Sequence, residues 1–156
     1  MVGVDGSAGA REALRFALAE ARLRGAVLET VLAWELPLYE GVPGPFLVEV
    51  PGELVPPLDE ARAVLRAGAE RRLDAELEAV LDGADAGVEI HRLVVEAPPA
   101  AALVDAAQGA DLLVVGSRGH GGFRGLLLGS VSQRCARSAP CPVAIVRAGP
   151  GDPAVP

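Results

Sequence analysis

Short apolar runs alternate with longer stretches of helical spacing along this chain, and this alternation is the feature that most restricts its fold. The runs that suit buried strands are residues 2–4, 27–34, 88–95, 110–116 and 142–147. The stretches that suit helices are residues 10–25, 59–82, 99–109 and 130–138. Such alternation builds a parallel sheet with helices on both faces. We therefore expect an α/β fold, a single-domain three-layer α/β/α sandwich around a five-stranded parallel sheet.

The domain is predicted to span residues 1–148, with a flexible tail at 149–156. Within it, the stretch 36–58 holds six of the chain's 13 prolines. Because proline fixes φ and removes a backbone donor, this stretch predicts a long loop, which we interpret as a mobile flap. The helix at 59–82 is expected to bury one apolar face, formed by residues 61, 64, 65, 69, 73, 77, 80 and 81. Five of its acidic residues are expected to lie on a solvated face: Asp59, Glu60, Glu70, Glu76 and Glu78.

Charge and composition narrow the classes of partner. The net charge is −7 and the pI about 4.8, which argues against binding nucleic acid or anionic membrane through bulk charge. No apolar run approaches the roughly 18 residues needed to span a bilayer, and no secretory signal is recognisable, so we expect a cytoplasmic protein. All 14 basic residues are arginine, which excludes a Schiff-base lysine and a Walker-type lysine. Cys135 and Cys141 are interpreted as small apolar core residues rather than a disulfide or a zinc site.

A glycine-rich stretch, GSRGHGGFRGLLLGS at residues 116–130, follows the fourth predicted strand and leads into a helix. Gly116 and Gly119 leave backbone N–H groups uncovered, and a helix that begins near Ser130 offers free N–H groups to an anion. Arg118 and Arg124 could add positive charge. Because parallel sheets bind ligands beyond the carboxyl ends of their strands, this stretch favours a phosphate site. A plain surface loop with Ser130 as helix cap is the alternative.

Established nucleotide fingerprints do not account for this stretch. The chain contains no G-x-x-x-x-G-K-[ST], and no G-x-G-x-x-G follows its first strand, so neither a P-loop nor an ordinary dinucleotide site is supported. His120 inside the loop and His91 on the third strand lack an evident catalytic partner, and we expect both to face solvent. Trp34 ends the second strand, where simple packing is favoured over stacking on a base.

The chain resembles the universal stress proteins of the UspA type. The nucleotide-binding signature of that family, G-x2-G-x9-G-[ST], is matched by Gly116, Gly119, Gly129 and Ser130 with its spacing intact. The start VGVDGS at 2–7 and the end SAPCPVAIVR at 138–147 are also similar to the family. Two departures stand out: Met1 alone precedes the first strand, which is therefore expected to be short, and Ala97 stands where the family often has glycine.

The resemblance implies a Rossmann-like adenine-nucleotide site on a sheet of strand order 3-2-1-4-5. Asp5 would accept hydrogen bonds from the adenosine of ATP, with Gly3 and Val4 in the same pocket and the backbone of Ala33 against the adenine. The ribose and first phosphates would be wrapped by Gly116, Ser117, Arg118 and Gly119. The outer phosphates, with or without Mg²⁺, would be held by Gly129, Ser130, Val131 and Ser132. The resemblance further implies a homodimer that pairs its last strands, residues 143–146.

The expected function is that of an ATP-binding universal stress protein, a cytosolic sensor or regulator that acts as a dimer. Three alternatives stay open at the level of the sequence. One is a slow ATPase on the same fold, for which only Arg118, Arg124 or a metal could stabilise the γ-phosphate charge and for which no general base is evident. Another is a member that has lost nucleotide binding and acts through protein contacts. The third is a different adenine ligand, AMP or cyclic AMP.

Overall fold

A five-stranded parallel sheet forms the centre of the chain, and a computed structural model describes it over residues 1–36, 58–119 and 127–148. The strands are β1 (Val2–Gly3), β2 (Leu28–Trp34), β3 (Ile90–Glu96), β4 (Leu113–Gly116) and β5 (Val143–Val146). The helices in the described ranges are α1 (Ala8–Arg24), α2 (Leu58–Leu81), α3 (Pro99–Ala106) and α4 (Ser130–Ser138). The strand order is β3-β2-β1-β4-β5, with every neighbouring pair parallel, which confirms the predicted fold and order.

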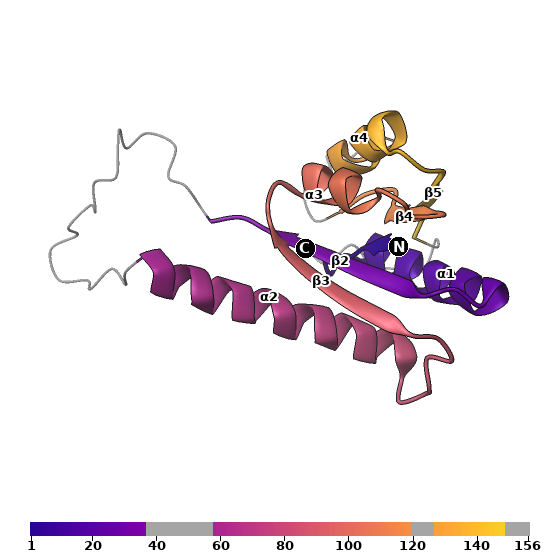
Figure 1. Ribbon diagram of the computed structural model, residues 1–156, viewed down its shortest axis with the longest axis horizontal. Coiled ribbons are helices and arrows are strands. Elements are labelled where there is room, and N and C mark those ends of the chain that lie inside the picture. Colours follow the sequence, from indigo (N-terminus) through magenta and orange to yellow (C-terminus); the bar gives the residue numbers. More distant parts are fainter. Residues whose placement is uncertain (37–57, 120–126, 149–156) are drawn as a thin grey trace, which may run out of the picture.

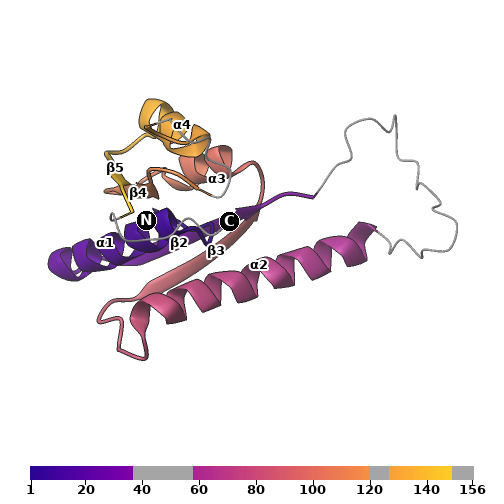
Figure 2. The ribbon, with the colours of Figure 1, turned by 180° about the vertical axis from the view of Figure 1, so that it is seen from behind.

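Helices cover both faces of the sheet, with α1 and α2 on one face and α3 and α4 on the other (Figure 1). The view from behind shows the same separation (Figure 2). Each face has its own apolar cluster: Leu14 and Leu73 pack with Val2 and Leu28 on the first, and Leu103 and Cys135 pack with neighbouring strand residues on the second. Central strands buried on both faces explain why the apolar runs of β1 and β4 lack alternation.

The central strand β1 is short, as expected. It contains two residues by its hydrogen-bond pattern, yet backbone bonds extend the contact on both sides of it. The N–H of Val4 donates to Val31 (2.9 Å), and the carbonyl of Met1 accepts from Val114 (2.9 Å). Residue 5 therefore already lies beyond the carboxyl edge of the sheet.

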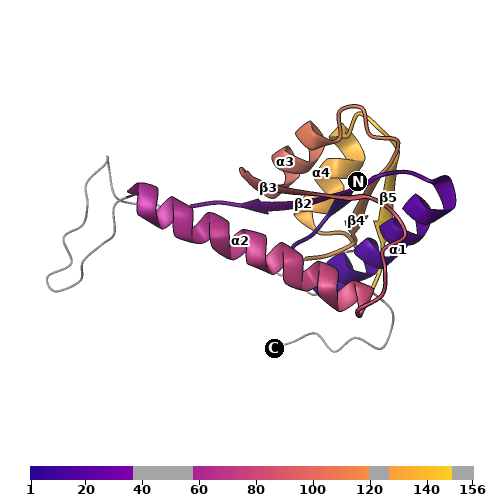
Figure 3. The same ribbon diagram turned by 60° about the horizontal axis from the view of Figure 1, so that its bottom comes forward.

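Helix α2 differs from its expected amphipathic pattern. Its buried residues begin at Ala69, whereas Val64 is 63% exposed and Leu58 is 57% exposed. Figures 1 and 3 show the N-terminal end of this helix reaching past the strand ends, where no sheet lies beneath it. The expectation of one continuous apolar face was therefore wrong for the first three turns, because helical spacing does not reveal how far the sheet extends.

Glu76 also departs from the solvated face predicted for it. It is 7% exposed, and its carboxylate accepts two hydrogen bonds from Arg11, at 2.7 Å from Nε and 3.0 Å from Nη2. A buried carboxylate requires such a partner, because burying an unpaired charge is costly. This ion pair fastens the C-terminal half of α2 to the first turn of α1.

The two cysteines are free thiols in unequal environments. Cys135 is fully buried in the second apolar cluster, and this burial raises the pKa of its thiol. Cys141 is half-buried and packs at the border of the same cluster, so the core assignment describes Cys135 better than Cys141. His91 is exposed and contacts Glu89 at 2.8 Å, in agreement with its expected surface position.

Parts of the expected organisation lie outside the described residues. The proline-rich stretch 36–58 is described only at its ends, where Leu36 follows β2 and Leu58 begins α2. His120, Arg124 and the tail 149–156 are likewise outside the described ranges. Of the helices in those ranges, none is both long and apolar enough to cross a bilayer.

Candidate functional site

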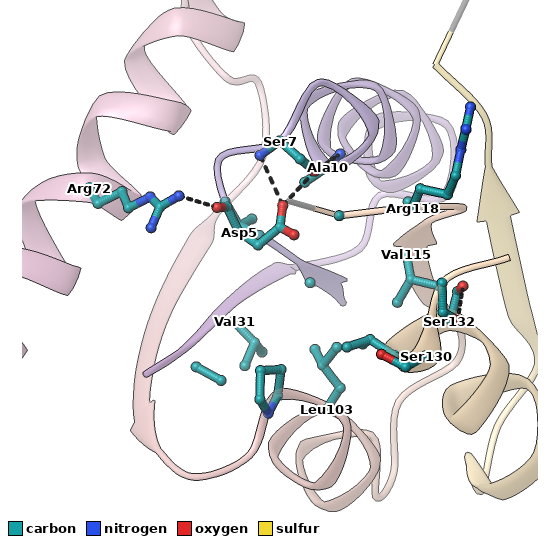
Figure 4. A pocket seen from close by; sticks show the side chains of 18 residues that line it. Asp5, Ser7, Ala10, Val31, Arg72, Leu103, Val115, Arg118, Ser130 and Ser132 are labelled. Carbon is teal, nitrogen blue, oxygen red and sulfur yellow. Dashed lines mark hydrogen bonds between the residues drawn. The ribbon is translucent and has the colours of Figure 1, made fainter. Parts of the chain in front are cut away.

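A cavity of about 360 Å³ opens beyond the carboxyl ends of β1, β2 and β4 (Figure 4). It lies at the point where the strand order changes direction, because β1 continues to β2 on one side and pairs with β4 on the other. Of the described residues expected at the site, all except Ser117 line this cavity. The lining residues that sequence reasoning did not name are Ser7, Ala10, Val31, Arg72, Pro99, Leu103 and Val115.

The turn after β1 holds the carboxylate of Asp5 in a fixed orientation. Its Oδ1 accepts hydrogen bonds from the backbone N–H of Ser7 (2.9 Å) and from the Ser7 hydroxyl (2.6 Å). The same hydroxyl accepts from the N–H of Ala10 (3.2 Å) and so caps α1. Gly6, between them, has φ +81°, a conformation that favours glycine. The turn thereby links Asp5 rigidly to the start of α1.

Gly116 owes its place to close packing of backbone. A Cβ atom at Gly116 would lie 2.7 Å from the carbonyl carbon of Gly9, and one at Gly9 would lie 2.7 Å from the carbonyl oxygen of Arg118. The glycine-rich stretch therefore packs against the first turn of α1 so closely that neither Gly116 nor Gly9 has room for a side chain. At the level of the sequence, Gly116 is explained by the need for uncovered N–H groups that bind phosphate. The close packing against α1 is a more direct reason for glycine at this position.

Gly119 adjoins Asp5. A Cβ at Gly119 would clash with Oδ2 of the Asp5 carboxylate, so glycine at this position leaves space for that side chain. The second glycine of the G-x2-G-x9-G-S pattern and the aspartate of VGVDGS thus meet at one end of the cavity. The motif and the N-terminal turn, more than 100 residues apart in sequence, form one local structure.

Ser117 faces the protein interior. Its N–H donates to Val146 (2.6 Å), and its carbonyl accepts from the N–H of Gly129 (2.7 Å) and the hydroxyl of Ser132 (3.0 Å). Ser117 is 5% exposed and does not line the cavity. It joins the end of β4 to the start of α4, a role that differs from the ligand contact expected for it.

The N-terminus of α4 faces the cavity. Gly129 precedes the helix with φ −77° and ψ 166°, and no side chain caps the first turn. The first N–H groups of a helix lack partners within that helix and carry the positive end of its dipole. Ser130 and Val131, at the start of α4, line the cavity. Ser132 is buried, and its hydroxyl donates to the carbonyls of Ser117 and Gly129 (2.9 Å), so it supports this helix start.

The opposite part of the cavity wall is apolar. Side chains from β2, α3, β4 and α4 form it: Val31, Ala33, Pro99, Leu103, Val115 and Val131. Figure 4 shows Val31 and Leu103 on the side of the cavity away from Arg118, whose guanidinium points away from the cavity. Trp34 is not among the lining residues and packs against the first apolar cluster, as favoured from sequence. The cavity therefore combines an apolar wall with a helix N-terminus.

Asp5 supplies the only carboxylate among the described residues that line the cavity. The described ranges also contain no group of three or more His, Cys, Asp or Glu side chains arranged to hold a metal ion. Arg72 is a cation of the cavity lining that no sequence pattern predicted. It comes from α2, and its guanidinium donates to the backbone carbonyl of Asp5.

The sequence profile of the universal stress protein family matches residues 1–147. The chain belongs to this family. A universal stress protein of Thermus aquaticus is 37% identical over 150 residues, which cover 94% of this chain and 96% of that protein. One of Mycolicibacterium smegmatis is 38% identical over 151 residues, which cover 94% of this chain and 45% of that protein. The chain thus spans about half the length of this mycobacterial relative.

A solved structure extends the comparison to a ligand-bound relative. The crystal structure of a universal stress protein in complex with cAMP superposes with a TM-score of 0.56 and is 27% identical, covering 95% of this chain and 94% of that one. This chain therefore has the sequence and the sheet topology of a universal stress protein.

Proposed function

We propose that this universal stress protein binds ATP in the cavity beyond β1, β2 and β4, and that it acts in the cytoplasm as a dimeric sensor or regulator of the stress response. One observation carries the proposal: an apolar wall, the Asp5 carboxylate and the uncapped start of α4 line the same cavity. These are the surfaces that adenine, ribose and phosphate require in that order. The related protein solved with cAMP supports an adenine nucleotide as the ligand class.

In this arrangement adenine lies between Val31 and Leu103, against the backbone of Ala33. Asp5 accepts hydrogen bonds from the adenosine, since its carboxylate lines the cavity and is held in orientation by Ser7. The phosphates extend toward Gly129 and Ser130, where N–H groups and the helix dipole favour negative charge. Mg²⁺ enters, where present, as part of the nucleotide complex. The chain supplies binding and orientation, and nucleotide occupancy is the signal.

The test is to identify the nucleotide that the protein carries and then to measure binding directly. Freshly purified protein is denatured, and the released small molecules are identified by mass spectrometry. Calorimetric titrations with ATP, AMP, cyclic AMP and adenosine, each with MgCl₂ and with EDTA, then rank the ligands. We expect ATP to be recovered and to bind. A tighter fit for cyclic AMP or AMP would replace ATP as the ligand, and ADP that accumulates from added ATP would establish slow hydrolysis. A protein that carries and binds none of these would refute the proposal.

The proposed dimer uses the outer edge of β5. The N–H of Leu113 donates to the carbonyl of Pro142 (2.9 Å), and that of Ser117 donates to the carbonyl of Val146 (2.6 Å). The backbone groups of the even-numbered residues therefore face β4. By the two-residue repeat of a strand, the backbone groups of Val143 and Ile145 face away from the sheet. An apolar edge with such groups pairs readily with a second strand. Two copies can therefore join through these edges.

Ile145→Pro is expected to convert the dimer to a monomer, because proline lacks the outward N–H that the partner strand would use. Ile145→Thr is the matched control, since it shortens the same side chain but keeps that N–H. Sedimentation equilibrium over a range of protein concentrations measures the association of both variants and the wild type, with circular dichroism to confirm folding. Equal association of the proline and threonine variants, or a monomeric wild type, would exclude pairing through β5.

A further inference from the structure

We propose that Arg72 is a positioning residue for the nucleotide site, and that it acts through Asp5 on the adenosine end of the ligand. The inference rests on the proposed function and adds a residue from α2, a helix outside the glycine-rich motif. Arg72 lines the cavity, and its guanidinium donates a hydrogen bond to the backbone carbonyl of Asp5. Figure 4 shows the side chain reaching from α2 to this carbonyl.

The guanidinium also lies against the turn that follows Asp5. A Cβ atom at Gly6 would lie 2.7 Å from Nη2, 2.8 Å from Nε and 3.1 Å from Cζ of Arg72. Arg72 therefore holds the peptide between Asp5 and Gly6, while Ser7 holds the carboxylate of Asp5. Because both the backbone carbonyl and the carboxylate of Asp5 are held, the orientation of Oδ2 is set before any ligand binds. A preorganised acceptor binds more tightly than one that must be ordered on binding.

Helix α2 is well suited to hold Arg72 in place. Leu73 is fully buried in the first apolar cluster, and Glu76, one turn after Arg72, pairs with Arg11 of α1. Arg11 in turn lies in the first turn of the helix that Ser7 caps. Residues four apart share one helix face, so the same side of α2 contacts the turn through Arg72 and the first turn of α1 through Glu76.

The position of Arg72 separates its effect from that of the phosphate contacts. Figure 4 shows Asp5 between Arg72 and the remainder of the site, with Ser130 on the far side of the cavity. A residue that acts through Asp5 changes the affinity for adenosine, AMP and ATP by one common factor. A residue that contacted the phosphates would change the affinity for ATP more than that for adenosine.

The experiment compares Arg72→Met with Arg71→Met, which makes the same change of charge and length at the neighbouring position of α2. Calorimetry gives the affinities of both variants and the wild type for adenosine, AMP and ATP. We expect Arg72→Met to weaken all three equally, by about tenfold, which is the usual effect of losing one hydrogen bond from a charged group. Arg71→Met should leave them unchanged, and Arg72→Lys should fall between the wild type and the methionine variant. Unchanged affinities, or a loss confined to AMP and ATP, would overturn the inference.

Two further measurements test the role of Arg72 separately from the proposed nucleotide binding. In a double-mutant cycle, Arg72→Met should cost little additional affinity once Asp5→Asn is present, because both act at one point. Without any ligand, the amide of Ser7 should exchange its hydrogen about tenfold faster in Arg72→Met than in Arg71→Met, because the turn that protects it is loosened. A wild type that bound none of the three ligands would refute the nucleotide proposal, and Ser7 exchange alone would then decide the role of Arg72. Equal exchange in the two variants would refute that role.

Discussion

Replacing Gly129 with aspartate is expected to lower the affinity for ATP at least a hundredfold, roughly 3 kcal/mol, without unfolding the protein. Gly129 has extended backbone angles, φ −77° and ψ 166°, that any residue can adopt. A Cβ there would make ordinary contacts, 3.5 Å to the Cα of Arg118 and 3.6 Å to the carbonyl oxygen of Ser117. Aspartate is also a favourable helix cap, so its carboxylate would accept from the N–H groups of α4 that the phosphates are proposed to use.

Gly129→Asn is the matched control, because asparagine has the same shape and caps a helix equally well but carries no charge. Calorimetric titration with ATP and with adenosine measures both variants. We expect Gly129→Asn to bind ATP within about tenfold of the wild type, since neutral capping competes without charge repulsion. Both variants should bind adenosine normally. If the two variants bound ATP equally well, the phosphates would have to lie elsewhere than at the start of α4.

Gly116→Ala is expected to destabilise the protein by about 3 kcal/mol, the upper part of the range for overpacking. The added Cβ would lie 2.7 Å from the carbonyl carbon of Gly9, 2.8 Å from its oxygen and 3.0 Å from the nitrogen of Ala10. All three are backbone atoms of the first turn of α1, and α1 cannot withdraw without loosening buried Leu14 from the core. For a chain of this length, that loss corresponds to a fall in Tm of about 10 °C.

Gly68→Ala provides the control for this second prediction. Gly68 lies inside α2, where an added Cβ would meet, beyond its own helix backbone and among the described residues, Nη2 of Arg71 at 4.0 Å. Alanine is there expected to stabilise the helix by about 0.5–1 kcal/mol, the usual gain over glycine. Urea unfolding of the wild type and both variants measures the free energies. A Gly116→Ala variant as stable as the wild type would show that the loop and α1 can separate freely.

The fold was predictable from sequence because its elements are marked locally. The apolar runs are separated by helix stops such as Gly25, which adopts the left-handed conformation at the end of α1, and the helix at 130–138 was placed at its observed ends. The predicted burial of α2 was wrong at Val64 and Glu76 for a non-local reason. The sheet ends before the helix does, and the partner of Glu76 is 65 residues away in sequence.

The residues of the candidate site that belong to a sequence motif could be predicted, whereas those brought to it by tertiary packing could not. The glycines of the motif and Asp5 converge on the cavity as the family resemblance implied. Ser117 belongs to the same motif, yet its carbonyl bonds to Gly129 and it faces inward, which spacing alone could not show. Arg72 and Leu103 reach the cavity from helices whose charged and apolar residues have ordinary helical spacing. Only the Ser7 cap had a local signal, a hydroxyl two residues after Asp5.

The bond between the carbonyl of Ser117 and the N–H of Gly129 has a consequence for protein engineering. It fastens the end of β4 directly to the start of α4, so the geometry of the helix start does not depend on the number of residues between them. Added chain length there costs only loop-closure entropy, about 0.6 kcal/mol for each doubling. A fluorescent reporter or an affinity tag inserted into the chain between Ser117 and Gly129 is therefore expected to leave the start of α4 in place. Because the start of α4 lines the cavity, such an insertion is expected to keep that part of the cavity wall intact.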